Sequence, residues 1–147
     1  MDMEVKNTGV ALMSRNRKAY DILIVEDNVE QASLTKMLME EYGFTAHYVT
    51  DSIEALKTIQ SDQPEVVILD LMMPELDGLR LCKKIKSSPM LGNTKIIIYS
   101  GKMYASDRRK ALELGADAFF IKPARANMLI TKIRELLHPI QNGTYQN

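Results

Sequence analysis

The stretch ILIVEDNVEQ, residues 22–31, joins four consecutive apolar residues to two adjacent acids, Glu26 and Asp27. A short run of isoleucine, leucine and valine is typical of a strand that is buried on both faces of a parallel sheet. Two neighbouring carboxylates repel each other, and the end of a buried strand is a costly place for them. The stretch therefore predicts a strand whose end faces something positively charged.

Four more segments of the chain have the composition of β-strands. With residues 21–26 they make a set of five, the others lying at 45–49, 65–70, 95–100 and 117–121. Three of the five are almost continuous in isoleucine, valine and leucine, which indicates central strands of a parallel sheet. The segment at 45–49 is more polar and is predicted to lie at an edge.

Helical patterns fill the intervals between these segments. They span residues 28–42, 51–61, 77–86, 105–114 and a last stretch that ends before Pro139. The first places Leu34, Met37 and Leu38 at the spacing of an apolar stripe and stops at Gly43. Asp51 begins a capping-box pattern that predicts the start of the second helix.

This alternation of strands and helices predicts an α/β fold. Strands that alternate with helices form a parallel sheet with right-handed crossovers, and the helices cover both of its faces. In such open sheets a ligand binds beyond the carboxyl ends of the strands. The residues that follow each strand are therefore the candidates for a site.

The composition is that of an ordinary globular protein and excludes several classes. The 147 residues suit one domain with a single core. Basic and acidic residues balance at 19 each, so overall charge offers no argument for binding nucleic acid or a membrane surface. The single cysteine, Cys82, fits a reducing compartment. Since no signal-peptide pattern or membrane-length apolar run is present, we expect a cytoplasmic protein.

The two ends of the chain differ from its middle. Residues 1–19 are polar and weakly patterned, and they lack the apolar surface that would offset the entropy of ordering. They are predicted to form a flexible arm. Residues 139–147 are predicted to be a short polar tail, which leaves residues 20–138 as the folded domain.

Polar side chains follow four of the predicted strands. Glu26 and Asp27 follow the first, and Asp70 follows the third. Ser100 ends the fourth strand, and Lys122 follows the fifth. Because the carboxyl ends of parallel strands lie along the same edge of a sheet, we expect these groups to lie close together.

Three carboxylates with one lysine leave a net negative charge that a divalent cation would neutralise. Ligands that are oxygen only, few and open to water favour Mg²⁺ over zinc, which would require histidine or cysteine. Neither His47 nor His138 falls at the end of a strand with a second ligand nearby. Both are predicted to be ordinary surface or packing residues.

The same groups form a set that handles a phosphoryl group. A hard cation and a lysine neutralise the phosphoryl oxygens, a hydroxyl donates a hydrogen bond, and a carboxylate can be the covalent acceptor. The chain has no glycine-rich loop of the kind that holds nucleotide phosphates. The phosphoryl group is therefore expected to come from another donor.

These residues resemble the receiver domains of two-component response regulators over residues 20–138. The resemblance lies in four motifs in order: Glu26-Asp27, LDLMMPELDG at residues 69–78, Ser100-Gly101, and Lys122-Pro123. It implies the flavodoxin-like (βα)5 fold, with a five-stranded parallel sheet in the order 2-1-3-4-5. It also implies a chemotaxis-type receiver that works in two-component or phosphorelay signalling.

The resemblance gives each site residue a role. Asp70 is implied to be the phosphoacceptor, which takes the phosphoryl group from a phosphohistidine of a histidine kinase or a histidine phosphotransfer protein. Lys122 would pair with Asp70 or the phosphoryl oxygens, and Ser100 would bond the phosphoryl group once it is present. A cis bond between Lys122 and Pro123 is also expected.

The resemblance also implies a magnesium site, in which Mn²⁺ could substitute. Asp27 and Asp70 are implied to be direct ligands, with the backbone carbonyl of Met72 as a third. Glu26 would reach the metal through a water molecule.

An aromatic residue three positions before the lysine changes rotamer with phosphorylation in receivers, and Phe119 holds that position here. Ser100 and Phe119 are thus the implied switch residues. Strand alternation predicts that Phe119 and Phe120 point to opposite faces of the sheet. The alternative, in which both are plain core residues, stays open.

The output surface is expected on the helix at 105–114, the strand at 117–121 and the last helix, where receivers commonly bind a protein partner or dimerise. Arg108, Arg109 and Lys110 form a basic run there that could equally be a solvated face. Only nine residues follow His138, too few for a DNA-binding output domain. We expect no direct contact with nucleic acid or a membrane.

The function predicted from the sequence is a phosphorylation-controlled switch with slow self-catalysed hydrolysis, and not an enzyme. Small phosphodonors are its only expected small-molecule substrates. A rival reading is a phosphatase with an aspartyl nucleophile, but such enzymes need a second acid two residues after it, where Met72 stands. A second rival is an interaction module whose pocket is never phosphorylated.

Overall fold

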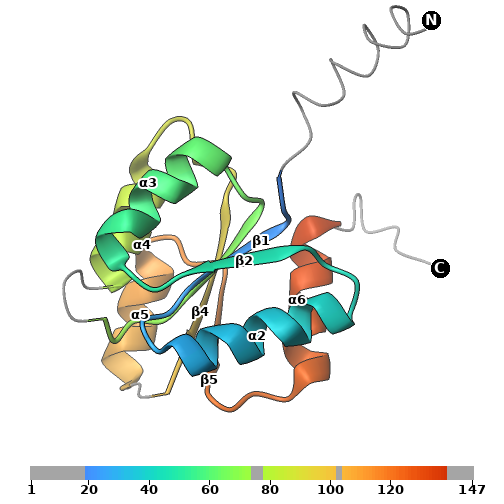
Figure 1. Ribbon diagram of the computed structural model, residues 1–147. Coiled ribbons are helices and arrows are strands. Elements are labelled where there is room, and N and C mark those ends of the chain that lie inside the picture. The colour runs from blue at the N-terminus through green and yellow to red at the C-terminus, as the bar shows by residue number, and fades with distance from the viewer. Residues whose placement is uncertain (1–18, 74–77, 102–103, 139–147) are drawn as a thin grey trace, which may run out of the picture.

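The computed structural model describes residues 19–73, 78–101 and 104–138. Five parallel strands form one sheet in the order β2-β1-β3-β4-β5 (Figure 1). The strands are β1 (Ile22–Val25), β2 (Ala46–Val49), β3 (Val66–Leu69), β4 (Lys95–Ser100) and β5 (Ala118–Ile121). The predicted fold class, strand order and strand positions are confirmed.

Helices cover both faces of the sheet, as Figure 1 shows. They are α2 (Val29–Glu41), α3 (Ser52–Asp62), α4 (Gly78–Ser87), α5 (Ala105–Glu113) and α6 (Ala126–Leu137). Buried residues of α3, α4 and α5 share one hydrophobic cluster, and buried residues of α2 and α6 share the other. The sheet therefore separates two cores.

The central strands supply side chains to both cores. Along β1, Leu23 and Val25 lie in the cluster with α3, α4 and α5, and Ile22 and Ile24 lie in the cluster with α2 and α6. All four are at most 2% exposed, which explains why this segment is apolar at every position. Strand β2 pairs only with β1 and is partly exposed, as expected of an edge strand.

The predicted apolar stripe of α2 is confirmed for Leu38, which packs against the core, and is wrong for Leu34 and Met37. Leu34 and Met37 are 65% and 61% exposed, whereas Ala32 and Met39 are fully buried. Ala32 and Met39 are seven residues apart, so they lie on the same side of the helix, two turns from each other. The small Ala32 lets the helix backbone approach the sheet closely, and Leu34 and Met37 face outward.

Side-chain caps stabilise the first turns of two helices. The Asn28 side chain accepts a hydrogen bond of 2.9 Å from the backbone N–H of Gln31 at the start of α2. The Asp51 side chain accepts one of 2.9 Å from the N–H of Ile53 at the start of α3, which confirms Asp51 as a cap. Both caps lie directly after strands, so each fixes a helix at the carboxyl edge of the sheet.

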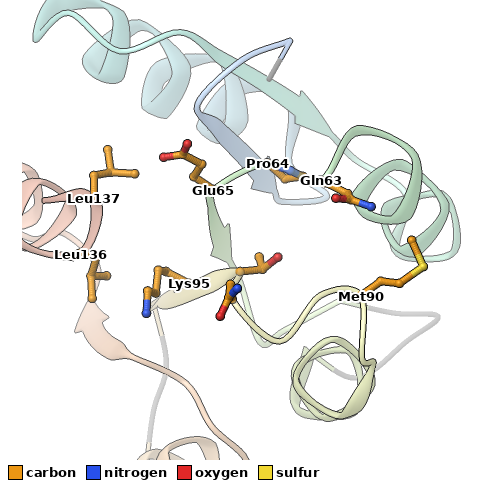
Figure 2. A pocket seen from close by; sticks show the side chains of 9 residues that line it. Gln63, Pro64, Glu65, Met90, Lys95, Leu136 and Leu137 are labelled. Carbon is orange, nitrogen blue, oxygen red and sulfur yellow. The ribbon is translucent and has the colours of Figure 1, made fainter. Parts of the chain in front are cut away.

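A hollow of about 320 Å³ opens at the opposite, amino edge of the sheet (Figure 2). It lies between the start of β4 and the end of α6, with Glu65, Lys95, Leu136 and Leu137 among its lining residues. Glu65 and Lys95 are the only charged residues that line it among those the structure describes. Among the described residues, this hollow is therefore lined by a single acid and a single base.

None of the helices in residues 19–73, 78–101 and 104–138 has both the length and the apolar character of a membrane span.

Candidate functional site

The polar residues predicted to converge do lie together at the carboxyl edge of the sheet. Glu26 and Asp27 follow β1, Asp70 follows β3, and Lys122 follows β5. All four line one hollow of about 340 Å³, together with Asn28, Gln31, Met72 and Gly101. The central position of β1 and β3 in the sheet brings the three acids side by side.

Three carboxylates form a cluster that fits a hard cation. One oxygen each from Glu26, Asp27 and Asp70 lies within 4.8 Å of the others. Glu26 and Asp70 are 5% and 8% exposed, and Asp27 is exposed to solvent. A compact set of oxygen atoms that is partly open to water is the arrangement that Mg²⁺ prefers. The donors present therefore fit a magnesium ion, and Met72 lines the same hollow.

The two oxygens of Asp70 have different surroundings. Oδ1 accepts a hydrogen bond of 2.8 Å from Ser100 Oγ and one of 3.0 Å from the backbone N–H of Met72. Oδ2 lies 3.6 Å from Lys122 Nζ, which is an ion pair but longer than a hydrogen bond. One oxygen is thus fixed by two donors, and the other is free to make a new bond.

Ser100 connects the end of β4 to Asp70. It is fully buried at the end of β4, and its hydroxyl bridges to β3 through the bond to Asp70 Oδ1. Since a hydroxyl group rotates, it can donate to a different oxygen when one is added to Asp70.

Lys122 contacts more partners than the sequence predicts. Its ammonium donates to Glu26 Oε1 in a very short ion pair and to Gln31 Oε1 at 2.6 Å. The ring of Tyr99 lies beneath it, with the centroid 5.5 Å away. The predicted pairing with Asp70 is present, but it is the longest of these polar contacts. The peptide bond between Lys122 and Pro123 is cis, as expected.

Burial raises the pKa of Glu26, and this effect is larger than any other at that carboxyl group. The hydrogen bonds from Lys122 and from the backbone N–H of Asn28 act in the opposite direction, and the charge of Asp70 adds to the rise. Both oxygens of Glu26 are engaged, since Oε2 accepts the Asn28 bond at 3.1 Å.

Gly78 places the start of α4 against Asp70 and Leu71, at the end of β3. A Cβ atom at this position would lie 2.7 Å from Leu71 Cα and 2.8 Å from the carbonyl oxygen of Asp70. Such distances are too short for any side chain, so α4 can begin this close to Asp70 only with glycine. The predicted helix start at Asp77 lies outside the described residues, and the described helix begins at Gly78.

Phe119 and Phe120 point to opposite faces of β5, as predicted. Phe119 packs against the core under α5, and Phe120 packs against the core under α2 and α6. The guanidinium of Arg108 lies 5.8 Å from the centroid of the Phe119 ring. This contact links the basic run of α5 to the implied switch residue, and no pattern in the sequence predicts it.

Comparisons with known proteins agree with this geometry. The sequence matches the family model of the response regulator receiver domain over residues 22–134. Among curated proteins, it is 32% identical to the uncharacterized transcriptional regulatory protein YclJ of Bacillus subtilis, over 79% of this chain and 50% of that protein. It is 33% identical to response regulator MprA of Mycobacterium ulcerans, over 79% of this chain and 49% of that protein. The chain thus spans about half the length of these relatives.

Solved structures give the same result. The signal receiver domain of a histidine kinase from Syntrophus aciditrophicus is 32% identical, with a TM-score of 0.75 and coverage of 88% of this chain and 98% of that one. A CheY-like receiver domain protein from Methanospirillum hungatei is 27% identical, with a TM-score of 0.75 and coverage of 80% and 92%. The chain belongs to the response regulator receiver domain family of two-component signalling.

Proposed function

We propose that this chain is a phosphorylation-controlled switch in which Asp70 is the phosphoacceptor. The observation that carries the proposal is the asymmetry of Asp70, whose Oδ1 is held by Ser100 and Met72 while Oδ2 faces the hollow. In the transfer, a carboxylate oxygen of Asp70 forms a bond to phosphorus. The bond from phosphorus to the donor histidine breaks, and its electron pair returns to the imidazole ring.

The charged and polar side chains around Asp70 would stabilise this step. Lys122 would neutralise charge on the phosphoryl oxygens, and Ser100 would move its hydrogen bond from Asp70 to one of them. Asp27 and Asp70 would hold Mg²⁺ or Mn²⁺, with the Met72 carbonyl as a further ligand and Glu26 acting through water. When bound, the ion supplies positive charge that offsets the phosphoryl oxygens and the acid cluster.

The exposed side of α2 supports a docking site for the phosphodonor. Any donor must bring its histidine to Asp70, so it must cover the rim of the hollow. Val29, Leu34 and Met37 are 57%, 65% and 61% exposed on this helix, and Leu34 lines a second hollow that adjoins Lys122. We propose that a histidine kinase or a histidine phosphotransfer protein packs on this apolar face.

The output surface is proposed on α5, β5 and α6. Tyr104, Leu112 and Ile121 are 63%, 45% and 56% exposed there, and Leu112 lines a shallow hollow with Arg108 and Arg109. Repacking of Phe119 beneath Arg108 would change this surface when Ser100 moves. A protein partner or a second copy of the chain would recognise the change.

The family assignment also supports proposals for the domain bounds, the location and the activity of the chain. The receiver unit would be residues 20–138, flanked by an arm at 1–19 and a tail at 139–147, and it would act in the cytoplasm beside its kinase. It would be a phosphoacceptor with slow self-hydrolysis and would have no turnover as an enzyme. It would bind neither nucleic acid nor membrane directly.

Incubation with Mg²⁺ and acetyl phosphate, followed by intact-mass measurement, tests the proposal. We expect the chain to gain one phosphoryl group and Asp70→Asn to gain none. Glu65→Gln, which alters an acid at the opposite edge of the sheet, is the matched control and should react like the wild type. Rapid consumption of acetyl phosphate would indicate a phosphatase. Absence of any gain would leave a pure interaction module.

A further inference from the structure

Glu26 and Gln31, rather than Asp70, set the position of the Lys122 ammonium. Nζ lies 2.6 Å from Gln31 Oε1 and is in close contact with Glu26 Oε1, but it is 3.6 Å from Asp70 Oδ2. Hydrogen bonds from nitrogen to oxygen span about 2.7–3.2 Å, so the last distance is too long for one. The ammonium is therefore bonded to Glu26 and Gln31 while Asp70 attracts it only through its charge.

One residue, Asn28, binds both the carboxylate of Glu26 and the backbone of Gln31. The backbone N–H of Asn28 donates to Glu26 Oε2 at 3.1 Å, and the Asn28 side chain accepts from the N–H of Gln31 at 2.9 Å. An ammonium group has only donors, so Gln31 must present its amide oxygen to it. The turn between β1 and α2 thus places two oxygens for the lysine before any phosphoryl group arrives.

We propose that Gln31 is a positioning residue that holds Lys122 away from Asp70 in the unphosphorylated state. This rests on the proposed function, because it concerns transfer to the same acceptor. Gln31 lines both the hollow that contains Asp70 and the adjoining hollow that contains Leu34. Its oxygen therefore competes with Asp70 and with incoming phosphoryl oxygens for the ammonium. Loss of that oxygen frees Lys122 to move toward Asp70 and speeds phosphorylation.

Two substitutions at Gln31 test this competition in opposite ways. Gln31→Met keeps the length of the side chain and removes the oxygen, so we expect phosphorylation by acetyl phosphate at saturating Mg²⁺ to be about threefold to tenfold faster. Gln31→Glu keeps an acceptor oxygen and should be no faster than wild type. Thr35→Val is the matched control, since Thr35 lines the adjoining hollow one turn further along α2 and should leave the rate unchanged.

Protein that lacks the Lys122 ammonium shows whether the rate effect of Gln31→Met depends on this lysine. In Lys122→Met protein, the additional change Gln31→Met should have no effect on the rate. The same acceleration in both backgrounds would overturn the proposal, as would an unchanged or slower rate for Gln31→Met alone. If wild-type protein accepts no phosphoryl group at Asp70, the proposed function itself fails and this inference fails with it.

Discussion

Among the individual residues of the site, Ser100 has a hydroxyl whose hydrogen bond should directly affect the rate of phosphorylation. It donates to Asp70 Oδ1 at 2.8 Å and is fully buried. We expect Ser100→Ala to slow phosphorylation by acetyl phosphate about tenfold, because a donor to the transferring group is lost. Ser100→Thr keeps the hydroxyl and should stay within about twofold of the wild-type rate. Equal rates for Ser100→Ala and wild type would exclude a role for this hydroxyl.

Cys82 is the only thiol of the chain, and it is fully buried on α4. Burial raises the pKa of Cys82 to about 11, so the reactive thiolate is scarce in the native state. We expect native protein to resist iodoacetamide at pH 8, whereas protein in concentrated urea gains one adduct in intact-mass spectra. Because the folded pKa is above its ordinary value, the contribution of Cys82 to stability should decrease as pH rises from about 9 toward 11. Rapid native labelling would contradict this burial.

The residues of the site could be predicted from the sequence, but their contacts could not. Asp70, Ser100 and Lys122 follow apolar strands, and parallel pairing alone brings them to one edge. The bond between Lys122 and Gln31 joins positions 91 residues apart and depends on how Asn28 caps α2. Nothing in the local pattern distinguishes Gln31 from a surface glutamine.

At the scale of the elements, the start of α4 depends on the absence of a side chain at Gly78. We expect Gly78→Ala to lower the free energy of unfolding by about 1–3 kcal/mol, because the new methyl group would meet the backbone of Leu71 and Asp70. Gly92→Ala is the matched control, since its Cβ would be no closer than 3.9 Å to Ser88 O. Urea unfolding measures both, and equal losses would show that the contact at Gly78 is not the cause.

A partly buried ion pair links the end of α4 to β4 and to the start of β5. Lys86 Nζ lies 3.0 Å from Asp117 Oδ2 and donates to the carbonyl of Thr94 at 2.8 Å, and Asp117 also accepts from the N–H of Ile96 at 2.8 Å. We expect Asp117→Ala to cost about 1–3 kcal/mol, because the partly buried Lys86 ammonium and the backbone N–H of Ile96 both lose this carboxylate. Urea unfolding measures the loss.

The surface pair of Lys132 and Glu135 provides the comparison for this ion pair. Its side chains are 38% and 55% exposed, so Glu135→Ala should cost less than about 0.5 kcal/mol. A loss for Asp117→Ala as small as that for Glu135→Ala would mean that the ion pair contributes nothing.

Helix α2 shows why the strands were easier to predict than the helix faces. A buried strand needs apolar residues at every position, and that pattern is unambiguous in β1. A helix can be held by a few small or flexible residues, here Ala32 and Met39, while larger apolar residues face outward. The misassigned Leu34 and Met37 are the residues that we propose for donor docking.

For the molecule as a whole, the acid cluster predicts that stability depends on divalent cations. A Mg²⁺ ion held by the folded site, and not by the unfolded chain, should raise the thermal unfolding midpoint relative to EDTA. In EDTA, Asp27→Asn should raise the midpoint by about 1–3 °C, because it removes one of three neighbouring charges. The same variant should lose the response to Mg²⁺. A response equal to that of wild type would show that Asp27 is not a ligand.

The overall architecture could be predicted in full because its determinants are repeated along the chain. Five strand segments, each followed by a helix, leave few ways to build a parallel sheet. The resemblance carried by the motifs, among them residues 69–78, then selects the strand order 2-1-3-4-5. The division of the structure into two cores follows from strand alternation. What the pattern left open is which side chains of each helix meet the sheet.

The burial of the only native thiol also makes the protein convenient for optical work. Met90 is 72% exposed beside the hollow at the amino edge of the sheet, and Cys82 is shielded from reagents. A Met90→Cys variant would therefore carry a single addressable handle for a fluorophore or a surface tether. Because the handle lies at the edge opposite Asp70, individual molecules could be immobilised and followed through cycles of phosphorylation with the reacting edge left open.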